Sequence, residues 1–238
     1  MKTIKLISLI TVLLSGILYS NYTSAQNIYE YDGVTYELHA YGEADIYRMS
    51  GNMPDTVRIP NTIEKDGITY KVKAVYKATF RRAPMKVLIW EADEVIKEWF
   101  FMECPNLTAV EIKGNVNELE ENAFQYCRNL KTVILNEGLQ YIGPHCFEQC
   151  TSLEEIVLPN SLIAVLGSGF NNCTSLKKVV FKNKQLEERM KKQINMTFLN
   201  TPFAQTVNNE PTAKRKPNQA VTNDSRFKVN KKSGVVVY

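Results

Sequence analysis

The sequence is poor in the side chains that most enzymes use for acid–base chemistry. Only two histidines, His39 and His145, occur among its 238 residues, and neither lies in a recognisable catalytic motif. The chain contains no glycine-rich phosphate loop, no HExxH zinc motif and no GxSxG nucleophile motif. We therefore predict that the protein is not an enzyme and that it holds no metal ion and no cofactor.

Apolar runs long enough to cross a bilayer, which takes about 20 residues, are also missing. The longest run, Leu6 to Tyr19, has 14 residues and follows the positive charges of Lys2 and Lys5. Small residues then lead to a possible cleavage site after about Ala25, which is the order of a secretory signal peptide. We predict that residues 1–25 are a signal peptide and that the mature chain is secreted, periplasmic or on the cell surface. A retained N-terminal anchor is the alternative.

Charge is distributed unevenly along the chain. Residues 182–238 contain 12 Lys and Arg against 4 Asp and Glu, a surplus of +8, whereas residues 26–181 contain 15 against 21, a deficit of −6. The basic end of the chain has no aromatic side chains interleaved with its KRK run, and export would keep it away from nucleic acid. We therefore expect no nucleic-acid partner. A solvated tail, or attraction to an anionic surface, explains the basic residues.

One pattern dominates the middle of the chain, a repeat of 23 residues that aligns six columns in four rows. A fifth, shortened row precedes them, in which Val75, Phe80, Met85, Leu88 and Trp90 hold the corresponding positions. The four full rows align Phe101, Phe124, Phe147 and Phe170; Cys104, Cys127, Cys150 and Cys173; Leu107, Leu130, Leu153 and Leu176; Val110, Val133, Ile156 and Val179; Ile112, Leu135, Leu158 and Phe181; and Ile96, Leu119, Ile142 and Val165.

Each repeat has the pattern of a short strand followed by a compact turn. Val133 and Leu135 alternate with outward residues at the period of a strand, and ENAFQYC predicts a single helical turn that carries Phe124 and Cys127 inward. The apolar face of one such unit is too small to be buried alone, so units stack and each covers the next. We predict that residues 73–181 form a solenoid of about five rungs with a parallel sheet.

The five cysteines permit three interpretations. Cys146 and Cys150, with His145 beside them, have metal-site spacing, but a fourth ligand is lacking because His39 lies far away in sequence. Cysteines on neighbouring rungs would have Cα atoms about 5 Å apart, within disulfide range. Stacked side chains point in parallel, however, and five cysteines cannot all pair. We favour buried, reduced thiols with a structural role, and disulfides are the alternative.

The repeat also resembles a known family. The pattern A/C/G-F-x-x-C-x-x-L-x-x-V/I-x-L, clear in ENAFQYCRNLKTVIL, CFEQCTSLEEIVLPNSL and GFNNCTSLKKVVF, is similar to the BspA-like leucine-rich repeats of secreted and surface proteins of gut and oral bacteria. VRIPNTIEKDGITYKVKAV resembles the segment before the first repeat, so the resemblance covers about residues 55–181. It implies a right-handed leucine-rich-repeat solenoid, β-rich with short helical turns, that serves as an interaction module without a catalytic motif. The shortened first row and the bulky WFFMECPNL depart from the pattern.

The segment before the solenoid predicts an N-terminal β-hairpin cap. YEYDGVTYELHAY and KDGITYKVKAV both place an Asp-Gly turn, at Asp32-Gly33 and Asp66-Gly67, between alternating stretches. We predict that residues 26–72 form hairpins that cover the first rung, because an uncovered rung would expose its core and strand edges. A small β ligand-binding module is the alternative.

The chain after the last repeat predicts a helix and then a tail. Leu186, Met190 and Ile194 recur every four residues, which favours one amphipathic helix within a C-terminal cap at residues 182–199. Residues 200–238 are rich in Asn, Thr, Pro and Lys and lack apolar periodicity, so we predict a basic flexible tail, whose last residues could add a strand here or on a partner.

The outward residues of the strands are the candidate binding site. Five parallel strands would expose an apolar stripe bordered by Glu111, Glu155 and Lys178, and a contiguous exposed apolar patch usually marks an interface. Alternatively, another segment of the chain covers the stripe, and Glu155 and Lys178 form a cross-strand pair. We predict a partner-binding face that contains Val87, Ile89, Glu111, Thr132, Ile134, Glu155, Val157, Lys178 and Val180.

Two functions compete for this solenoid. The first is an exported, non-catalytic module that binds a protein partner through the strand face. The second is a structural or carbohydrate-binding component of the cell envelope, which would use exposed aromatic side chains; Trp99, Tyr126 and Tyr141 are the candidates near the outer edges of the rungs.

Overall fold

The computed structural model describes residues 27–209, 228–229 and 236–237. The predicted signal peptide and most of the predicted tail lie outside these residues. The chain divides into two compact units, residues 1–207 and 208–238. The second contains an antiparallel pair of two-residue strands, β15 (Lys228–Val229) and β16 (Val236–Val237).

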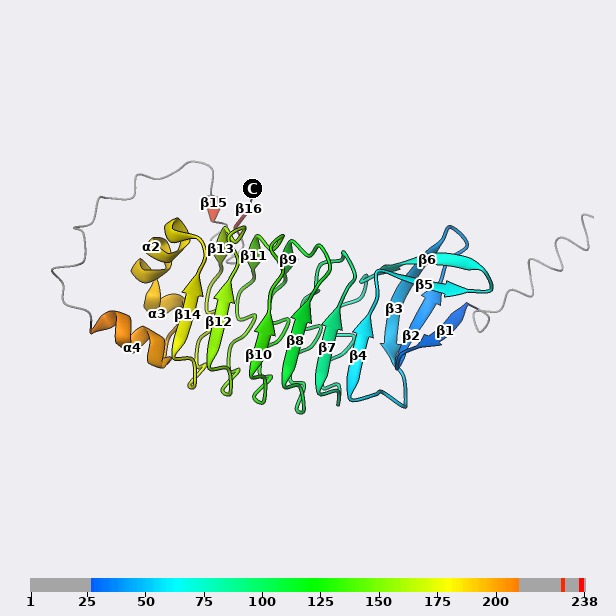
Figure 1. The fold of residues 1–238 in the computed structure, drawn as a ribbon, viewed down its shortest axis with the longest axis horizontal. Helices are drawn as coiled ribbons and strands as arrows, with labels where there is room; N and C mark the ends of the chain where they lie inside the picture. The colour runs from blue at the N-terminus through cyan, green and yellow to red at the C-terminus, as the bar shows by residue number, and fades with distance from the viewer. Residues whose placement is uncertain (1–26, 210–227, 230–235, 238) are drawn as a thin grey trace, which may run out of the picture. The chain divides into compact units, whose positions relative to one another are not determined.

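Parallel strands lie side by side along the first unit, one for each rung (Figure 1). The aligned columns set their register: Val110 is paired with Val133, and Ile156 with Val179. Because side chains alternate along a strand, these residues and their equivalents point into the core. The strands are β4 (Thr56–Ile59), β7 (Val87–Trp90), β8 (Ala109–Ile112), β10 (Thr132–Ile134), β12 (Glu155–Leu158) and β14 (Lys178–Phe181).

The strand series differs from the sequence-based expectation at its beginning. β4 pairs in parallel with β7, so the solenoid sheet starts within the range 26–72 that we assigned to the cap. The reason is that Val57 and Ile59 alternate inward as the later rows do, and both are fully buried. Val75, placed in an inward column, is instead 50% exposed, and its neighbour Ala74 is buried.

The series also differs in the middle, because the strands form two sheets. One sheet has the order β10-β8-β7-β4, and the other contains only β12 and β14. β10 ends at Ile134, one position before the column that Ile112 and Leu158 fill with buried side chains, and Leu135 there is only half-buried. The continuous five-stranded sheet that we predicted is therefore interrupted between β10 and β12.

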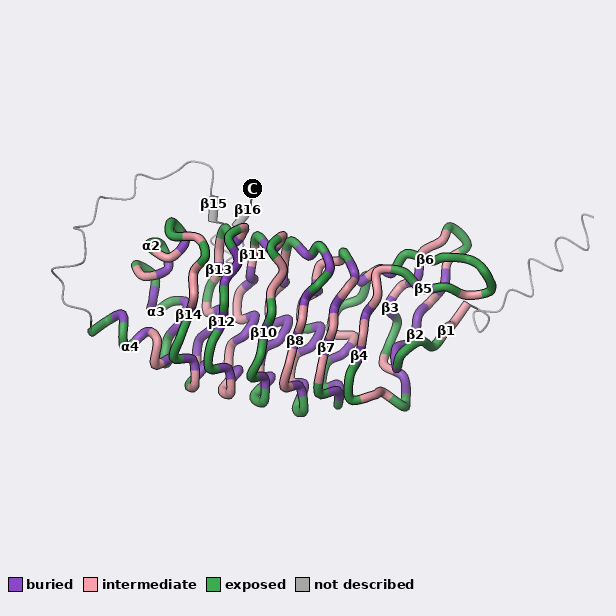
Figure 2. Tube along the Cα trace, viewed as in Figure 1, coloured by how far each residue is buried: buried purple, intermediate pink, exposed green. Residues whose placement is uncertain are grey.

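The phenylalanine column forms the opposite side of the core. Its rings stack in sequence with each pair of centroids 5.3 Å apart and interplanar angles of 9° or less. Figure 2 shows buried positions recurring in each turn of the chain. The column is longer than predicted at its C-terminal end, because Phe198 stacks on Phe170 although 28 residues rather than 23 separate them. The stacked residues are Phe80, Phe101, Phe124, Phe147, Phe170 and Phe198.

The segments that carry this column are turns and not the single helical turn that we predicted. Asn122 and Tyr126, for example, have φ of 58° and 61°, and two such left-handed residues in one segment prevent a helix. The turns are joined between rungs by backbone hydrogen bonds: the N–H of Phe124 donates to the carbonyl of Cys146 at 2.9 Å, and that of Tyr126 to Glu148 at 2.9 Å. We call this surface the turn side.

A third sheet of short parallel strands joins the turn side to the strands. It contains the buried column of Leu119, Ile142 and Val165, and Ile96 extends it through an isolated bridge to Leu119. The strands are β9 (Glu118–Leu119), β11 (Tyr141–Ile142) and β13 (Ala164–Val165).

The N-terminal region is a five-stranded sheet with the order β1-β2-β3-β6-β5. Both Asp-Gly pairs make tight hairpin turns, because Asp32 and Asp66 and the glycines that follow them all have positive φ, as type I′ turns require. The two predicted hairpins are thus confirmed. The strands are β1 (Ile28–Tyr31), β2 (Val34–Leu38), β3 (Glu43–Met49), β5 (Thr62–Lys65) and β6 (Ile68–Lys73).

Three helices follow β14: α2 (Lys184–Lys192), α3 (Ile194–Thr197) and α4 (Pro202–Asn208). The side chain of Asn183 caps α2 by accepting hydrogen bonds from the N–H groups of Gln185 and Leu186. The apolar residues that we assigned to one helix are buried but divided between α2 and α3, since the backbone leaves helical geometry at Gln193.

Helix α4 lies inside the range 200–238 that we predicted to be flexible. Its Phe203 ring packs edge-to-face on Phe198, with centroids 5.3 Å apart, and Thr201 is fully buried. The packed core therefore continues to α4, because this apolar cluster closes the end of the phenylalanine column.

Candidate binding surfaces

The candidate strand face is exposed at one end and half-buried at the other. Five of the nine predicted residues are exposed, and they lie on β10, β12 and β14. The remaining four are half-buried, and three of them lie on β7 and β8. The exposed residues are Thr132, Ile134, Glu155, Val157 and Lys178, and the half-buried ones are Val87, Ile89, Glu111 and Val180.

The apolar part of the face is concentrated at the interruption between β10 and β12. Ile134 is 52% exposed and Val157 is 39% exposed, and they stand on the two strands that flank the interruption. A shallow hollow of about 170 Å³ lies there. It is lined by Val133, Ile134, Leu135, Val157, Pro159 and Lys182.

Charged residues on the face pair with one another. Lys178 donates a hydrogen bond to Glu155 at 2.7 Å, which is the cross-strand pair considered from the sequence. Glu111 is 3.3 Å from Lys113, and Lys182, at the rim of the hollow, pairs with Glu137. Exposed pairs of this kind contribute only about 0–1 kcal/mol to stability, so they remain available to exchange partners.

The cysteines are buried within the turn side. All five are free and buried, and each thiol of the repeated column donates a hydrogen bond to the phenylalanine carbonyl of the preceding rung. Cys127, for example, donates to the carbonyl of Phe101 at 3.1 Å, and Cys150 to that of Phe124 at 3.3 Å. The column thus joins rungs through S–H···O contacts, which explains why cysteine recurs there.

Burial keeps four of these thiols protonated. Desolvation raises the pKa of Cys127, Cys146 and Cys150 well above its usual range, and it raises the pKa of Cys173 to about 12. The ring of His145 instead bonds to the Glu148 carboxylate at 2.9 Å. No group of three or more potential metal ligands occurs in the part of the chain that the structure describes.

The three candidate aromatic residues lie in different places. Trp99 and Tyr126 occupy left-handed positions on the turn side, and Tyr141 lies on β11. Trp99 is 39% exposed with Lys77 over its ring, whereas Tyr126 is half-buried with the Arg128 guanidinium 5.8 Å from its ring centroid. They therefore do not form one platform.

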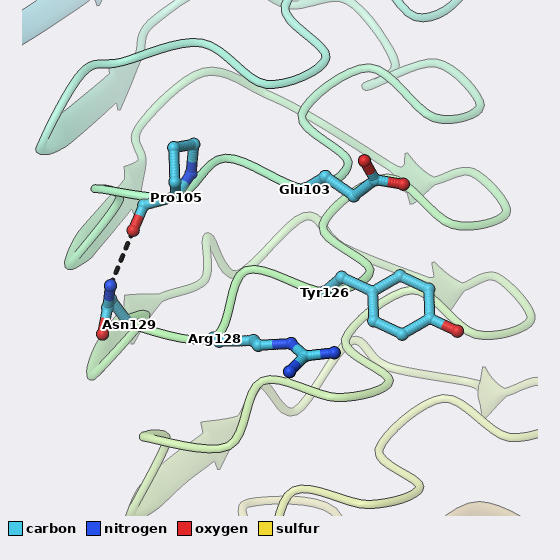
Figure 3. Close-up of a pocket in the computed structure, with 5 residues that line it drawn as sticks. All are labelled: Glu103, Pro105, Tyr126, Arg128 and Asn129. Atoms are coloured by element: carbon cyan, nitrogen blue, oxygen red, sulfur yellow. Dashed lines mark hydrogen bonds between the residues drawn. The ribbon is translucent and has the colours of Figure 1, made fainter.

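Two features of the surface were not predicted from the sequence. Tyr41, Tyr47 and Tyr76 are 71%, 44% and 43% exposed in the N-terminal region. A pocket of about 490 Å³ also opens on the turn side between the first and second full-length rows (Figure 3). Its lining comes from two turns 23 residues apart, so only the repeat register could have indicated it.

Comparison with known proteins identifies the repeat. Residues 73–210, more than half of the chain, match six copies of the family described as BspA type Leucine rich repeat region. The chain belongs to this family. Its fold is that of a leucine-rich-repeat solenoid with parallel sheets, preceded by the mainly antiparallel N-terminal sheet. The sixth copy agrees with the extension of the phenylalanine column to Phe198.

Solved structures share the fold of this BspA-type chain. A leucine-rich repeat protein from Bacteroides ovatus has a TM-score of 0.56 at 24% identity, over 64% of this chain and 40% of that one. The leucine-rich repeat protein of T. pallidum has a TM-score of 0.52 at 22% identity, over 65% of this chain and 83% of that one. This chain thus corresponds to less than half of the Bacteroides ovatus protein. No curated protein sequence matches it.

None of the helices within the described residues of this BspA-type chain is long and apolar enough to cross a membrane.

Proposed function

We propose that this chain is an exported, non-catalytic interaction module that presents its strand face to a protein partner at or outside the cell surface. The signal-peptide pattern of residues 1–25 supports export. Membership of a leucine-rich-repeat family supports a binding role, since stacked repeats offer an extended, rigid surface.

The exposure of Ile134 and Val157 is the observation that carries this proposal. Two β-branched apolar side chains stand side by side on neighbouring rungs, and no segment among the described residues covers them. The charges of Glu155 and Lys178 lie beside them, so the face has an apolar centre and a polar rim, as protein interfaces do. The hollow beside Val157 would accept one apolar side chain of the partner.

The double substitution Ile134→Asp and Val157→Asp should abolish capture of the partner. It places two charges in the apolar centre, and central apolar contacts dominate binding energy, so we expect affinity to fall at least about 100-fold. The measurement is a pull-down from the native cell envelope with the mature chain as bait. Folding should be preserved because both side chains point outward.

Ile163→Asp is the matched control, since Ile163 is 38% exposed but lies beside β13 and outside the strand face. The proposal predicts that this variant captures the partner as well as the native chain does. Capture that survives the double substitution but fails with Trp99→Ala would contradict the proposal and favour the carbohydrate-binding or structural role in the envelope.

A further inference from the structure

The turn side carries a pocket whose chemistry differs from that of the strand face. It is lined by Glu103 and Pro105 from one turn and by Tyr126, Arg128 and Asn129 from the next. In Figure 3, Glu103, Tyr126 and Arg128 extend in the same direction, and Asn129 bonds to the carbonyl of Pro105. At about 490 Å³ the pocket is in the size range of small-ligand sites, roughly 300–1,000 Å³.

Positive charge is in excess around this pocket. The Glu103 carboxylate is occupied by two guanidinium groups, Arg81 at 2.8 Å and Arg82 at 2.5 Å. Arg128 is exposed and forms no ion pair within the described part of the chain. The one carboxylate that lines the pocket is thus already paired with two guanidinium groups, and Arg128 adds a further positive charge, in a body whose net formal charge over residues 26–181 is −6. An anionic ligand complements this charge.

The fold does not account for the tyrosine in the pocket. Tyr126 has φ of 61°, and the equivalent left-handed positions of the other rungs hold Arg82, Glu103, Gln149, Asn172 and Asn200, so the backbone there does not itself select a tyrosine. Its ring lies beside the Arg128 guanidinium, 5.8 Å from ring centroid to the central carbon, which holds the cation in place beside an apolar surface. Tyr126 and Arg128 thus form a preorganised pair.

We infer that this pocket binds a sugar that carries a carboxylate, such as a uronic acid. The planar guanidinium of Arg128 matches a carboxylate with two parallel hydrogen bonds. The Tyr126 ring and Pro105 provide apolar surface for one face of the sugar ring. The amide oxygen of Asn129 and the Tyr126 hydroxyl are suited to sugar hydroxyls. The site is separate from the strand face, so this inference and the proposed function stand or fall independently.

Galacturonate and galactose differ only at C6, which is a carboxylate in the first and a hydroxymethyl group in the second. They form the test pair, and their binding to the full chain is measured by calorimetry at low salt. We expect galacturonate to bind at least ten-fold more tightly than galactose. Arg128→Gln should remove this preference, and Tyr126→Asn, which suits the left-handed backbone, should weaken binding of both sugars.

Arg48→Gln is the matched control, because Arg48 also lies over a tyrosine, 5.7 Å from the Tyr47 ring centroid, but in the N-terminal sheet. It should leave both affinities unchanged. The inference is overturned if neither sugar binds up to its solubility limit, if the two bind equally, or if Arg128→Gln keeps the preference. An acidic dipeptide that displaces galacturonate with equal or higher affinity would also overturn it, in favour of a peptide site.

Discussion

Replacing Phe147 with alanine should lower the free energy of unfolding by about 3–5 kcal/mol, the usual cost of removing a buried phenylalanine ring. Phe147 is fully buried and stacks on Phe124 and Phe170, each 5.3 Å away between ring centroids. Its loss leaves a cavity between two rungs that cannot close, because the backbone hydrogen bonds on either side fix the spacing. Urea denaturation measures the change.

Phe203→Ala is the control for this prediction. Phe203 is half-buried and packs at the end of the column against Phe198, so its removal should cost less than about 2 kcal/mol. A loss below about 1 kcal/mol for Phe147→Ala would contradict the stacked column.

All five cysteines should be unreactive in the folded protein and fully reactive when it unfolds. The thiols are buried, and desolvation raises the pKa of Cys127, Cys146, Cys150 and Cys173, so the nucleophilic thiolate is nearly absent. Dithionitrobenzoate at pH 8 should therefore detect no thiol in the native protein and five in guanidinium. Fewer than five in denaturant would show that a disulfide forms, against this account.

The same raised pKa values predict how stability depends on pH. In the unfolded chain these four thiols ionise near pH 8.5, whereas the folded chain keeps them protonated. The unfolded state therefore binds fewer protons at alkaline pH, and the free energy of unfolding should decrease as pH rises above about 8.5. Each thiol contributes at most about 1.4 kcal/mol per pH unit. Cys150→Ala should make this decrease shallower; an unchanged slope would contradict the assignment.

The core of the solenoid could be predicted from the sequence because the same positions of each 23-residue repeat carry apolar residues. A residue such as Leu130 or Leu153 recurs every 23 positions only if each turn of chain has the same length, and turns of equal length stack in register. Both side chains are fully buried, as the columns require. The hairpins at Asp32 and Asp66 were predictable for a different reason, since Asp-Gly accommodates positive φ.

The ends of the solenoid were harder to predict because the spacing changes there. Phe198 follows Phe170 by 28 residues, since α2 and α3 occupy the intervening chain, and so a fixed period misses it. Val57 and Ile59 on β4 were overlooked because their row lacks the phenylalanine and cysteine columns. No feature of the sequence indicates that β10 ends at Ile134, so the interruption of the sheet between β10 and β12 could not be predicted.

The candidate binding surfaces, too, could be predicted from the sequence only in part. Alternation along each strand correctly indicates which residues face outward, such as Ile134 and Val157, but not how exposed each of them is. The half-buried state of Val87 and Ile89 depends on neighbouring strands and turns. The pocket at Tyr126 and Arg128 depends on charges from three successive turns, which a single repeat does not reveal.

A double-mutant cycle on the phenylalanine column tests the stacked rungs most directly. Phe124 and Phe147 lie on adjacent rungs with their rings only 2° from parallel. The account predicts that alanine substitutions at these two positions couple by about 0.5–1.5 kcal/mol. The same substitutions at Phe101 and Phe170, which are not neighbours in the column, should add within about 0.5 kcal/mol. Strict additivity for the adjacent pair, or equal coupling for both pairs, would contradict it.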